Sequence, residues 1–549
     1  MIKNNEIPQL NSRARGWLRH IWDKATTKDD WSISGDPLPW WDKTSTSPMC
    51  AFPRFDLSET SYSLPMMFDQ TPAWSEVYAR IADELVSRFP TFWGAIDWLT
   101  LIGNDPNREN YPPEWQVWMP AHLRGNYDPP GWTGNGAEPW GLQPDPIAAD
   151  GNLFFRGFFN LLLGTHSYVS NDKKWERPFD VTGYNNQSFE WDYHSINRFI
   201  HDQWTERPQG AHCENTKIWP YCLSAAGLGL QLHDKLYESK SHSVYDEWIE
   251  FAKKHFAKRN RSGDLKSFAF YYDPIEKFGY FPDEGLAGYG MLAPLLYLYP
   301  QAPEFGLELY QAGINDLGWD DHNKLLVQGF ADPRWLCIVL MLAREVGDAT
   351  TERRLKAFAE KEWGPYFYTD GDRFAWSFGL DEDHPRGQLN SLLILSEIGN
   401  PGAWSRVYSG KKATRPGEPE VVGVSFPDMG LDRAFFDPGT GVLHVSTYAG
   451  NKIAEKNSTT WRVKNLANTK SVFVLLDGEE FQSWRSIDDS TIEISCKIKE
   501  QDFHIVQDIE DSQPFRTSET VATPKLAGVT NTVMAEKPCF TIGHNIGCC

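Results

Sequence analysis

The chain has 549 residues, more than a single hydrophobic core usually serves, so two domains are the default expectation. Its 41% hydrophobic and 23% charged residues are typical of a globular protein and exclude a disordered one. The net charge of −21 argues against nucleic acid and anionic membrane surfaces as partners, because both are bound through basic patches.

The first residues, 1–6, lack the basic and apolar segments of a secretory signal, and no apolar run approaches the roughly 20 residues of a membrane span. The eight cysteines are too dilute for a disulfide framework, which favours a reducing compartment. We therefore predict a cytoplasmic protein without stable membrane insertion. Prenylation of the Cys548-Cys549 pair is disfavoured because no polybasic stretch precedes it.

Helical periodicity dominates the first 400 residues. Two stretches, 31–75 and 112–147, are rich in Trp, Pro, Gly and Asp and predict long ordered loops. Between them, residues 77–99 carry apolar side chains at three- and four-residue spacings. Further helices are predicted near 152–168, 190–206, 217–238, 243–259, 285–298, 304–317, 332–347, 351–363 and 386–398.

About a dozen short helices without intervening strands indicate a solenoid or a closed ring of helical hairpins. We predict an (α/α)6 toroid, because no fixed-period repeat is present. A Lys-, Arg-, Gly- and Pro-rich stretch near 409–419 reads as a linker, and period-two alternation follows, as in residues 491–498. Residues 1–410 are therefore predicted to form the catalytic helical barrel, and residues 411–549 an antiparallel β domain with a C-terminal tail.

Several common catalytic machineries have no counterpart in the sequence. Residues 285–290 miss the dinucleotide fingerprint, and there is no phosphate-binding loop, zinc-protease helix or serine nucleophile elbow. The acidic cluster 381–384 offers ligands for magnesium, but solvated loop acids are far commoner. We predict no metal site.

One segment, residues 211–222, combines a carboxylate with two thiols. A loop here turns into a helix that Thr216 can cap and that tolerates Pro220 only in its first turn. This places Cys213 and Glu214 at the mouth of the helix and Cys222 about two turns inward. Such groups can handle protons, although buried structural cysteines and a surface glutamate are the commoner explanation.

Three stretches resemble the linalool dehydratase/isomerase family, in the same chain order. Arg198–Asp202 followed by Cys213-Glu214 and Cys222 is similar to the cysteine segment of that family, with the same nine-residue interval between the cysteines. Residues 152–161 and 342–348 are similar to two further segments. The resemblance covers roughly residues 60–400 and leaves out the first fifty residues, the stretch 112–147 and the β domain.

The resemblance implies an (α/α)6 barrel whose central cavity converts a monoterpene alcohol by acid–base chemistry without a cofactor. It implies that Cys213 and Cys222 are paired active-site cysteines and that Glu214 is the adjacent carboxylate. Tyr62 is similar to a tyrosine that contacts substrate, and Tyr289 to a second one. A looser correspondence adds Asp23 to the catalytic residues.

One position departs from the family. The catalytic histidine that follows a glycine in the family is replaced here by Phe158, which cannot transfer a proton. Phe154 and Phe158 lie four residues apart on one helix face and, with Trp219, form the predicted aromatic wall for substrate. Such a wall suits a carbocation or a long polyene better than general-base work.

We therefore predict a cofactor-independent terpenoid cyclase, isomerase or dehydratase that acts on a small hydrophobic isoprenoid or meroterpenoid in a closed aromatic cavity. Mg²⁺ is expected only if the substrate is a prenyl diphosphate, and the aspartate motif of ordinary terpene cyclases is missing. A pericyclic reaction and assembly into a homo-oligomer are left open.

The alternative is a carbohydrate-active (α/α)6 hydrolase or lyase. That chemistry needs a pair of carboxylates about 5 to 10 Å apart across a cleft, for which Asp192, Glu214 and Asp283 are candidates. A third possibility is a binding protein without catalytic activity.

Overall fold

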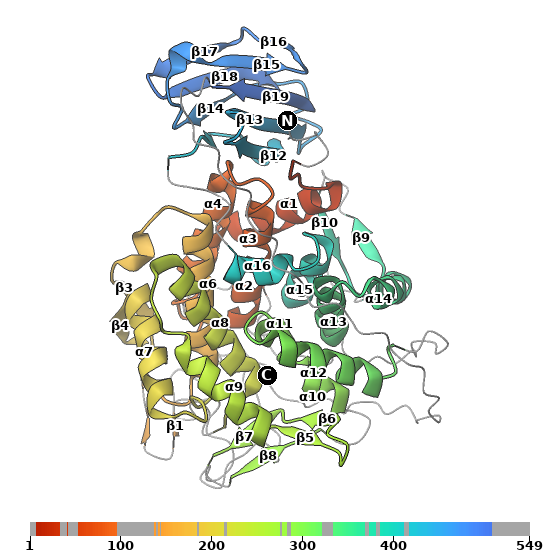
Figure 1. Ribbon diagram of the computed structural model, residues 1–549. Helices are drawn as coiled ribbons and strands as arrows, with labels where there is room; N and C mark the ends of the chain where they lie inside the picture. The colour runs from red at the N-terminus through yellow and green to blue at the C-terminus, as the bar shows by residue number, and fades with distance from the viewer. Residues whose placement is uncertain are drawn as a thin grey trace.

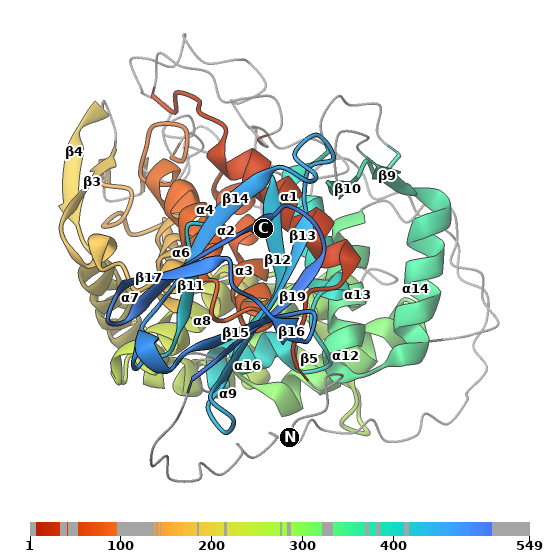
Figure 2. The same cartoon turned by 90° about the horizontal axis from the view of Figure 1, so that it is seen from above.

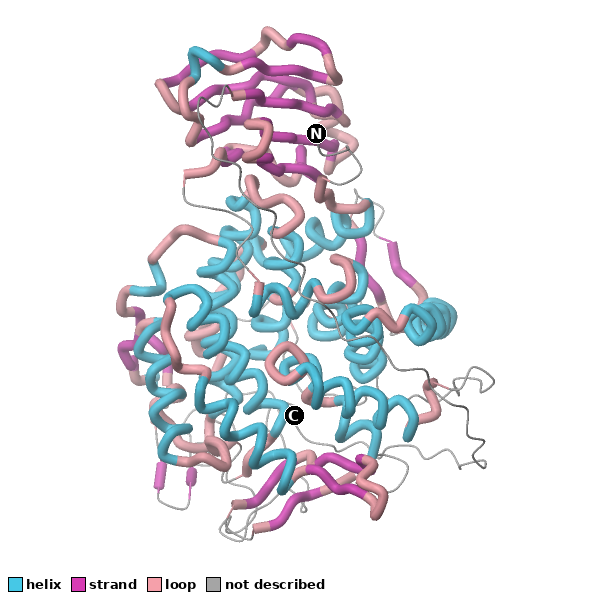
Figure 3. Tube along the Cα trace, in the orientation of Figure 1, coloured by secondary structure: helices cyan, strands magenta, loops and turns pink. Residues whose placement is uncertain are grey.

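The computed structural model describes residues 7–32, 41, 53–95, 137–138, 141–142, 144–183, 186–213, 217–274, 277–282, 287–320, 333–367, 373–379, 385–410 and 417–507. Within these residues, helices predominate up to residue 410 and antiparallel strands follow (Figures 1 and 3). We call these two regions the helical part and the β module. The predicted boundary at 410/411 borders residues 411–416, which lie outside the described residues.

The helices of the described residues are α1 (Ser12–Thr26), α2 (Pro53–Ser61), α3 (Ser63–Phe68), α4 (Ser75–Arg88), α6 (Leu153–Val169), α7 (Tyr193–Glu206), α8 (Pro220–Tyr237), α9 (Ser243–His255), α10 (Ala287–Leu292), α11 (Leu295–Leu298), α12 (Pro303–Asp316), α13 (Pro333–Val346), α14 (Ala349–Glu362), α15 (Gly387–Glu397) and α16 (Ala403–Ser409), with short 3-10 turns at Lys174–Glu176 and, in the β module, Thr469–Ser471. The mainly helical class with a following antiparallel β part agrees with the sequence. Closure of the helices into an (α/α)6 toroid stays a prediction. Among the described residues, no helix combines the length and apolarity needed to cross a bilayer.

The prediction of a helical part without strands was wrong. Two-stranded antiparallel sheets connect the helices: β1 (Ala137–Glu138) with β2 (Gly141–Leu142), β3 (Phe179–Thr182) with β4 (Ser188–Trp191), β5 (Ala257–Arg259) with β6 (Leu265–Phe268), β7 (Tyr271–Asp273) with β8 (Phe278–Tyr280), and β9 (Pro365–Phe367) with β10 (Phe374–Trp376). These strands are two to four residues long, so each is too short to show a clear period-two pattern.

Some predicted helix bounds were wrong, and in each case below a proline or an N-cap residue explains where the helix begins or ends. Helix α4 ends at Arg88 rather than Leu99 because Pro90, two residues on, has no N–H to continue the helical hydrogen bonds. The predicted helix 285–298 is divided into α10 and α11 at Pro294, which has no N–H to donate. Helix α7 starts at Tyr193, where the Asp192 side chain accepts a hydrogen bond from the Ser195 backbone in a capping box.

Helix α2 was missed entirely because residues 31–75 were assigned to a loop. All of its residues are buried, including Arg54, Asp56 and Glu59, so it has no polar face from which a helical period could be read. It packs against α4, α6 and α15. Helix α6 in turn packs closely on α8. At their contact a Cβ added at Gly157 would lie only 2.9 Å from the Ala226 Cβ, which is too close for any residue but glycine.

The β module consists of two antiparallel sheets. One has the order β11-β14-β18-β17 and the other β12-β13-β19-β15-β16. Their strands are β11 (Glu420–Val422), β12 (Met429–Asp437), β13 (Val442–Ala449), β14 (Ser458–Lys464), β15 (Phe473–Leu476), β16 (Glu479–Glu480), β17 (Trp484–Asp488), β18 (Thr491–Lys497) and β19 (Gln501–Val506). The Asp477-Gly478 hairpin, expected from the dipeptide alone, joins β15 to β16 with positive φ at both residues.

The β module rests on the connection between α3 and α4 and on α1 (Figures 1 and 2). Ala73 donates its N–H to Ala434 O of β12 at 2.9 Å and accepts from Val421 N of β11 at 2.7 Å. The Leu10 N–H, just before α1, donates to Asp432 O at 2.8 Å. Ala73 therefore bridges the edge strands of both sheets.

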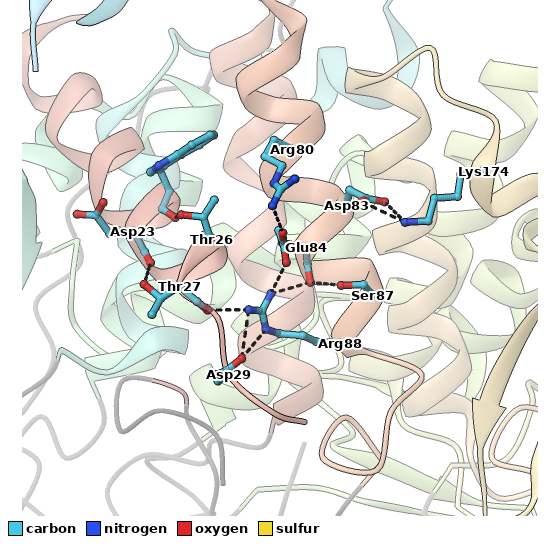
Figure 4. Close-up of polar contacts among 11 residues, drawn as sticks. Asp23, Thr26, Thr27, Asp29, Arg80, Asp83, Glu84, Ser87, Arg88 and Lys174 are labelled. Carbon is cyan, nitrogen blue, oxygen red and sulfur yellow. Dashed lines mark hydrogen bonds and ion pairs between the residues drawn. The ribbon is translucent and has the colours of Figure 1, made fainter. Parts of the chain in front are cut away.

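Arg88 ties the end of α1 to α4 (Figure 4). Its guanidinium donates to Thr27 O at 3.0 Å and to the buried Asp29 carboxylate at 3.2 Å, and it also pairs with Glu84. Arg80, just over two turns back on the same helix, pairs with Glu84 too, but its side chain is 55% exposed against 7% for Arg88. Arg88 and Arg80 can therefore be compared as a buried and an exposed partner of the same carboxylate, Glu84.

Replacement of Arg88 by alanine is expected to lower the free energy of unfolding by about 3 to 5 kcal/mol, because it removes one partner of a buried ion pair. Arg80→Ala should cost about 1 kcal/mol or less, since exposed pairs contribute little. Urea denaturation followed by circular dichroism measures both. Equal losses in the two variants would contradict the importance of burial.

Candidate functional site

Five buried side chains from separate parts of the helical part meet around a carboxyl group. Glu59 lies on α2, Tyr62 directly before α3, Phe158 on α6, Tyr221 on α8 and Tyr297 on α11. We call these residues the Glu59 cluster. Tyr62 and Phe158 were predicted from the sequence to contact substrate, and the structure brings them together.

The local sequence positions the aromatic members. Pro220 occupies the first turn of α8, where its missing N–H is tolerated, so that Tyr221 is the second residue of the helix. The close packing of α6 on α8 at Gly157 places Phe158 over Tyr221, with ring centroids 6.0 Å apart and an interplanar angle of 30°. Pro294 is the N-cap of α11, the helix that carries Tyr297.

The tyrosines converge on one oxygen of the carboxyl group. Tyr221 donates to Glu59 Oε1 at 2.9 Å, and Tyr297 donates to the same atom at 3.1 Å. Tyr62 extends the network, with its hydroxyl 3.3 Å from that of Tyr297 and 3.0 Å from Ser58 Oγ. Glu59 Oε2 is buried and accepts no hydrogen bond from any described residue.

Burial raises the pKa of Glu59 to about 7, so the carboxyl is partly protonated at neutral pH. The hydrogen bonds from Tyr221 and Tyr297, the nearby Gln388 amide and the charge of Arg334 lower this pKa but do not offset the desolvation. Burial also raises the pKa of Tyr62 well above its ordinary value. A buried carboxylic acid with a pKa near neutral pH, surrounded by neutral phenol groups, can both donate and accept a proton.

Aromatic rings surround this acid. The Phe158 ring lies edge-on to Phe55 and Tyr297, at 5.1 and 5.6 Å between centroids. Phe154, predicted as part of the same wall, instead lies beneath the Arg54 guanidinium at 3.7 Å. Its ring face is therefore occupied by a cation of the protein, whereas Phe158 stays within the cluster.

Cys213 and Cys222 are both buried and not joined in a disulfide. Cys222 is the third residue of α8, directly after Tyr221, rather than two turns inward, because the helix begins at Pro220 with Trp219 as its N-cap. The predicted cap Thr216 and the predicted catalytic Glu214 lie outside the described residues.

Buried charged residues lie near Cys213. The Cys213 N–H donates to Lys217 O at 2.7 Å, and the Lys217 ammonium pairs with Asp273. Burial lowers the pKa of Arg156 to about 10, although Asp150 and the Cys213 thiol, both nearby, raise it. The Arg156 guanidinium itself donates to the backbone oxygens of Ala149 and Asp150.

The remaining predicted residues lie in different surroundings. Tyr289 on α10 packs on Trp335 at 5.5 Å, and Trp219 packs on Tyr271 at 5.1 Å. Asp23 accepts from Arg19 with both oxygens at 2.9 Å, and its side chain points away from α4 (Figure 4).

A buried aspartate lies instead on α2, one turn from Glu59. Asp56 is held by the Lys24 ammonium at 2.6 and 2.7 Å. Neither Asp56 nor Glu59 was predicted as a site residue, whereas Asp23 was. Their signal was the spacing Asp56, Glu59, Tyr62, which repeats every three residues directly before the predicted tyrosine.

Comparison with known proteins agrees with the resemblance. Residues 112–274 match the model of the family described as linalool dehydratase/isomerase. This part of the chain is therefore similar to the linalool dehydratase/isomerase family. The predicted extent was wrong, because the match includes the stretch 112–147. Phe158, Cys213 and Tyr221 lie within the matched residues, whereas Glu59 and Tyr297 lie outside them.

Three solved structures of carbohydrate-active enzymes align with 90% of the length of this chain, each with a low TM-score. The endoglucanase CelQ from Clostridium thermocellum complexed with cellotriose has a TM-score of 0.31 at 10% identity, over 92% of its chain. A GH127 β-L-arabinofuranosidase from Geobacillus stearothermophilus T6 has 0.25 at 10%, over 80% of its chain. The GH127 β-arabinofuranosidase BT3674 has 0.20 at 11%, over 74%.

The elevated pKa of Glu59 predicts a pH dependence of stability. The folded state binds the proton more tightly than the unfolded state, so this contribution is fully present below about pH 4.5 and is lost as the pH rises to about 7. The loss should amount to about 3 kcal/mol. Glu59→Gln should abolish this component when unfolding free energies are compared between pH 4.5 and 8. A parallel pH dependence in both proteins would contradict it.

Proposed function

We propose that the chain is a terpenoid-converting lyase or isomerase that acts on an isoprenoid or meroterpenoid without a cofactor. The observation that carries the proposal is the Glu59 cluster, a buried acid walled by aromatic rings beside a segment that matches the linalool dehydratase/isomerase family. Aromatic faces stabilise carbocations, and a buried acid can start their formation. In this proposal the helices close as an (α/α)6 barrel around the cluster.

Phe158 supports a substrate other than linalool itself. It is fully buried and packed by Phe55, Tyr221 and Tyr297, so the position where the family has a histidine belongs to the aromatic wall. We propose cyclisation, isomerisation or dehydration of a larger isoprenoid. Cys213, Cys222, Glu214 and Tyr289 are proposed to take part in proton transfer.

The carbohydrate-active alternative has no specific support among the described residues. Asp192, one of its candidate carboxylates, caps α7 by accepting from the Ser195 N–H at 2.9 Å. The other two candidates, Glu214 and Asp283, lie outside the described residues. Oligosaccharides are therefore included in the test as competitors.

The test is incubation of the full chain with isoprenoid alcohols, prenyl diphosphates with and without Mg²⁺, and oligosaccharides, followed by gas or liquid chromatography with mass spectrometry. We expect an isoprenoid alcohol to be consumed without added metal. Release of sugars from the oligosaccharides, with no isoprenoid converted, would overturn the proposal.

Cys213→Ala is expected to lower turnover of the isoprenoid by at least about 100-fold, because it removes a proposed proton-transfer group. Cys496→Ala is the matched control, since Cys496 is also a buried free cysteine but lies on β18 of the β module. Thermal unfolding checks that both variants fold. Full activity of Cys213→Ala would remove this residue from the mechanism.

A further inference from the structure

The hydrogen bonds at Glu59 determine which oxygen carries the proton. Tyr221 and Tyr297 both donate to Oε1, which fills the two lone pairs of that oxygen. In the neutral carboxyl group Oε1 is therefore the carbonyl oxygen, and the proton resides on Oε2.

The Oε2 atom is a buried donor in need of an acceptor. None of the described residues donates a hydrogen bond to it, and a buried polar group without a partner is unfavourable. A ligand oxygen would supply the missing acceptor. Glu59 has no exposed surface in this conformation, so a ligand can reach Oε2 only when a neighbouring side chain moves.

The surroundings also stabilise the carboxylate that proton donation leaves behind. The two phenol groups continue to donate to Oε1, and Arg334 of α13 and Gln388 of α15 also favour the charged form of the carboxyl. No rearrangement of these donors is needed when the charge appears, which is the electrostatic preorganisation that lowers a barrier.

We infer that Glu59 is the general acid of the site and that its Oε2 proton is delivered to the hydroxyl oxygen of an uncharged isoprenoid alcohol. This inference rests on the function proposed above. An uncharged alcohol fits better than a diphosphate, because an anionic group would meet the forming carboxylate with a like charge.

The step balances without a further reactant. The Oε2–H bond breaks and a new O–H bond forms on the alcohol, and the C–O bond then breaks with its electron pair on the departing water. The carbocation that remains lies against Phe158 and its aromatic neighbours. It loses a proton from carbon, directly or after ring closure by an internal double bond, and this proton returns to Glu59 through the proton-transfer groups proposed above.

Glu59→Gln is expected to lower kcat by about 10²- to 10⁴-fold with KM nearly unchanged, because glutamine keeps the shape of the side chain but cannot donate the proton to the alcohol. Glu345→Gln is the matched control. Glu345 is also a buried glutamate, yet it accepts from the Trp404 and Ser405 N–H groups as the cap of α16. That variant should keep its kcat.

The pH profile separates catalysis from a structural role. Wild-type kcat should fall as the pH rises through about 7, where Glu59 loses its proton. Tyr221→Phe removes a donor that lowers the pKa of Glu59, so the alkaline limb should move to higher pH in this variant. An unmoved limb would overturn the assignment of the acid.

An infrared measurement tests the inference without turnover. Glu59 should give a protonated carboxyl band at pH 6 that Glu59→Gln lacks, and a saturated isoprenoid alcohol should shift this band as Oε2–H gains an acceptor. If isoprenoids are converted but Glu59→Gln keeps the full rate, the inference fails and the proposed function stands. If no isoprenoid alcohol binds or shifts the band, both fail.

Discussion

Burial of α2 along its whole length is the constraint on which the site depends, because every ionisable side chain of this helix must find partners inside the protein. Each finds a different kind. Asp56 is held by the Lys24 ammonium, Arg54 stacks on the Phe154 ring, and Glu59 accepts hydrogen bonds from neutral phenols. Asp56 thus has an ammonium group as its partner, whereas Glu59, one turn along the helix, accepts from neutral hydroxyl groups. Only the second kind of environment favours a protonated acid.

The fold could be predicted from the sequence wherever an element has one polar face. Strand β18 alternates buried and outward residues at its C-terminal end, and helix α4 carries an apolar stripe, so β18 and the start of α4 were predicted at nearly the right place. Helix α2 has neither, because it is buried on all sides. Its Trp- and Pro-rich flanks then directed the interpretation toward a loop.

The candidate site was predictable only in part, for a related reason. Tyr62 and Phe158 were found because they lie in segments that resemble a family, and the structure brings both to Glu59. Tyr297 is 238 residues from Glu59 along the chain, and nothing local marks it as a donor to that carboxyl. A contact of this kind follows from the packing of α2, α8 and α11, not from any motif. The family match, over residues 112–274, likewise contains the wall of the cluster but not its acid.

The bridging position of Ala73 has a consequence for solubility. Strands β11 and β12 are the outer strands of their sheets, and an outer strand exposes N–H and C=O groups that can recruit strands from other molecules. Through its backbone Ala73 bonds to Ala434 and Val421, and Leu10 bonds to Asp432, so the helical part covers these edges. The same contacts that attach the β module therefore protect it from edge-to-edge aggregation, and loosening α1 or the α3–α4 connection would expose a template for it.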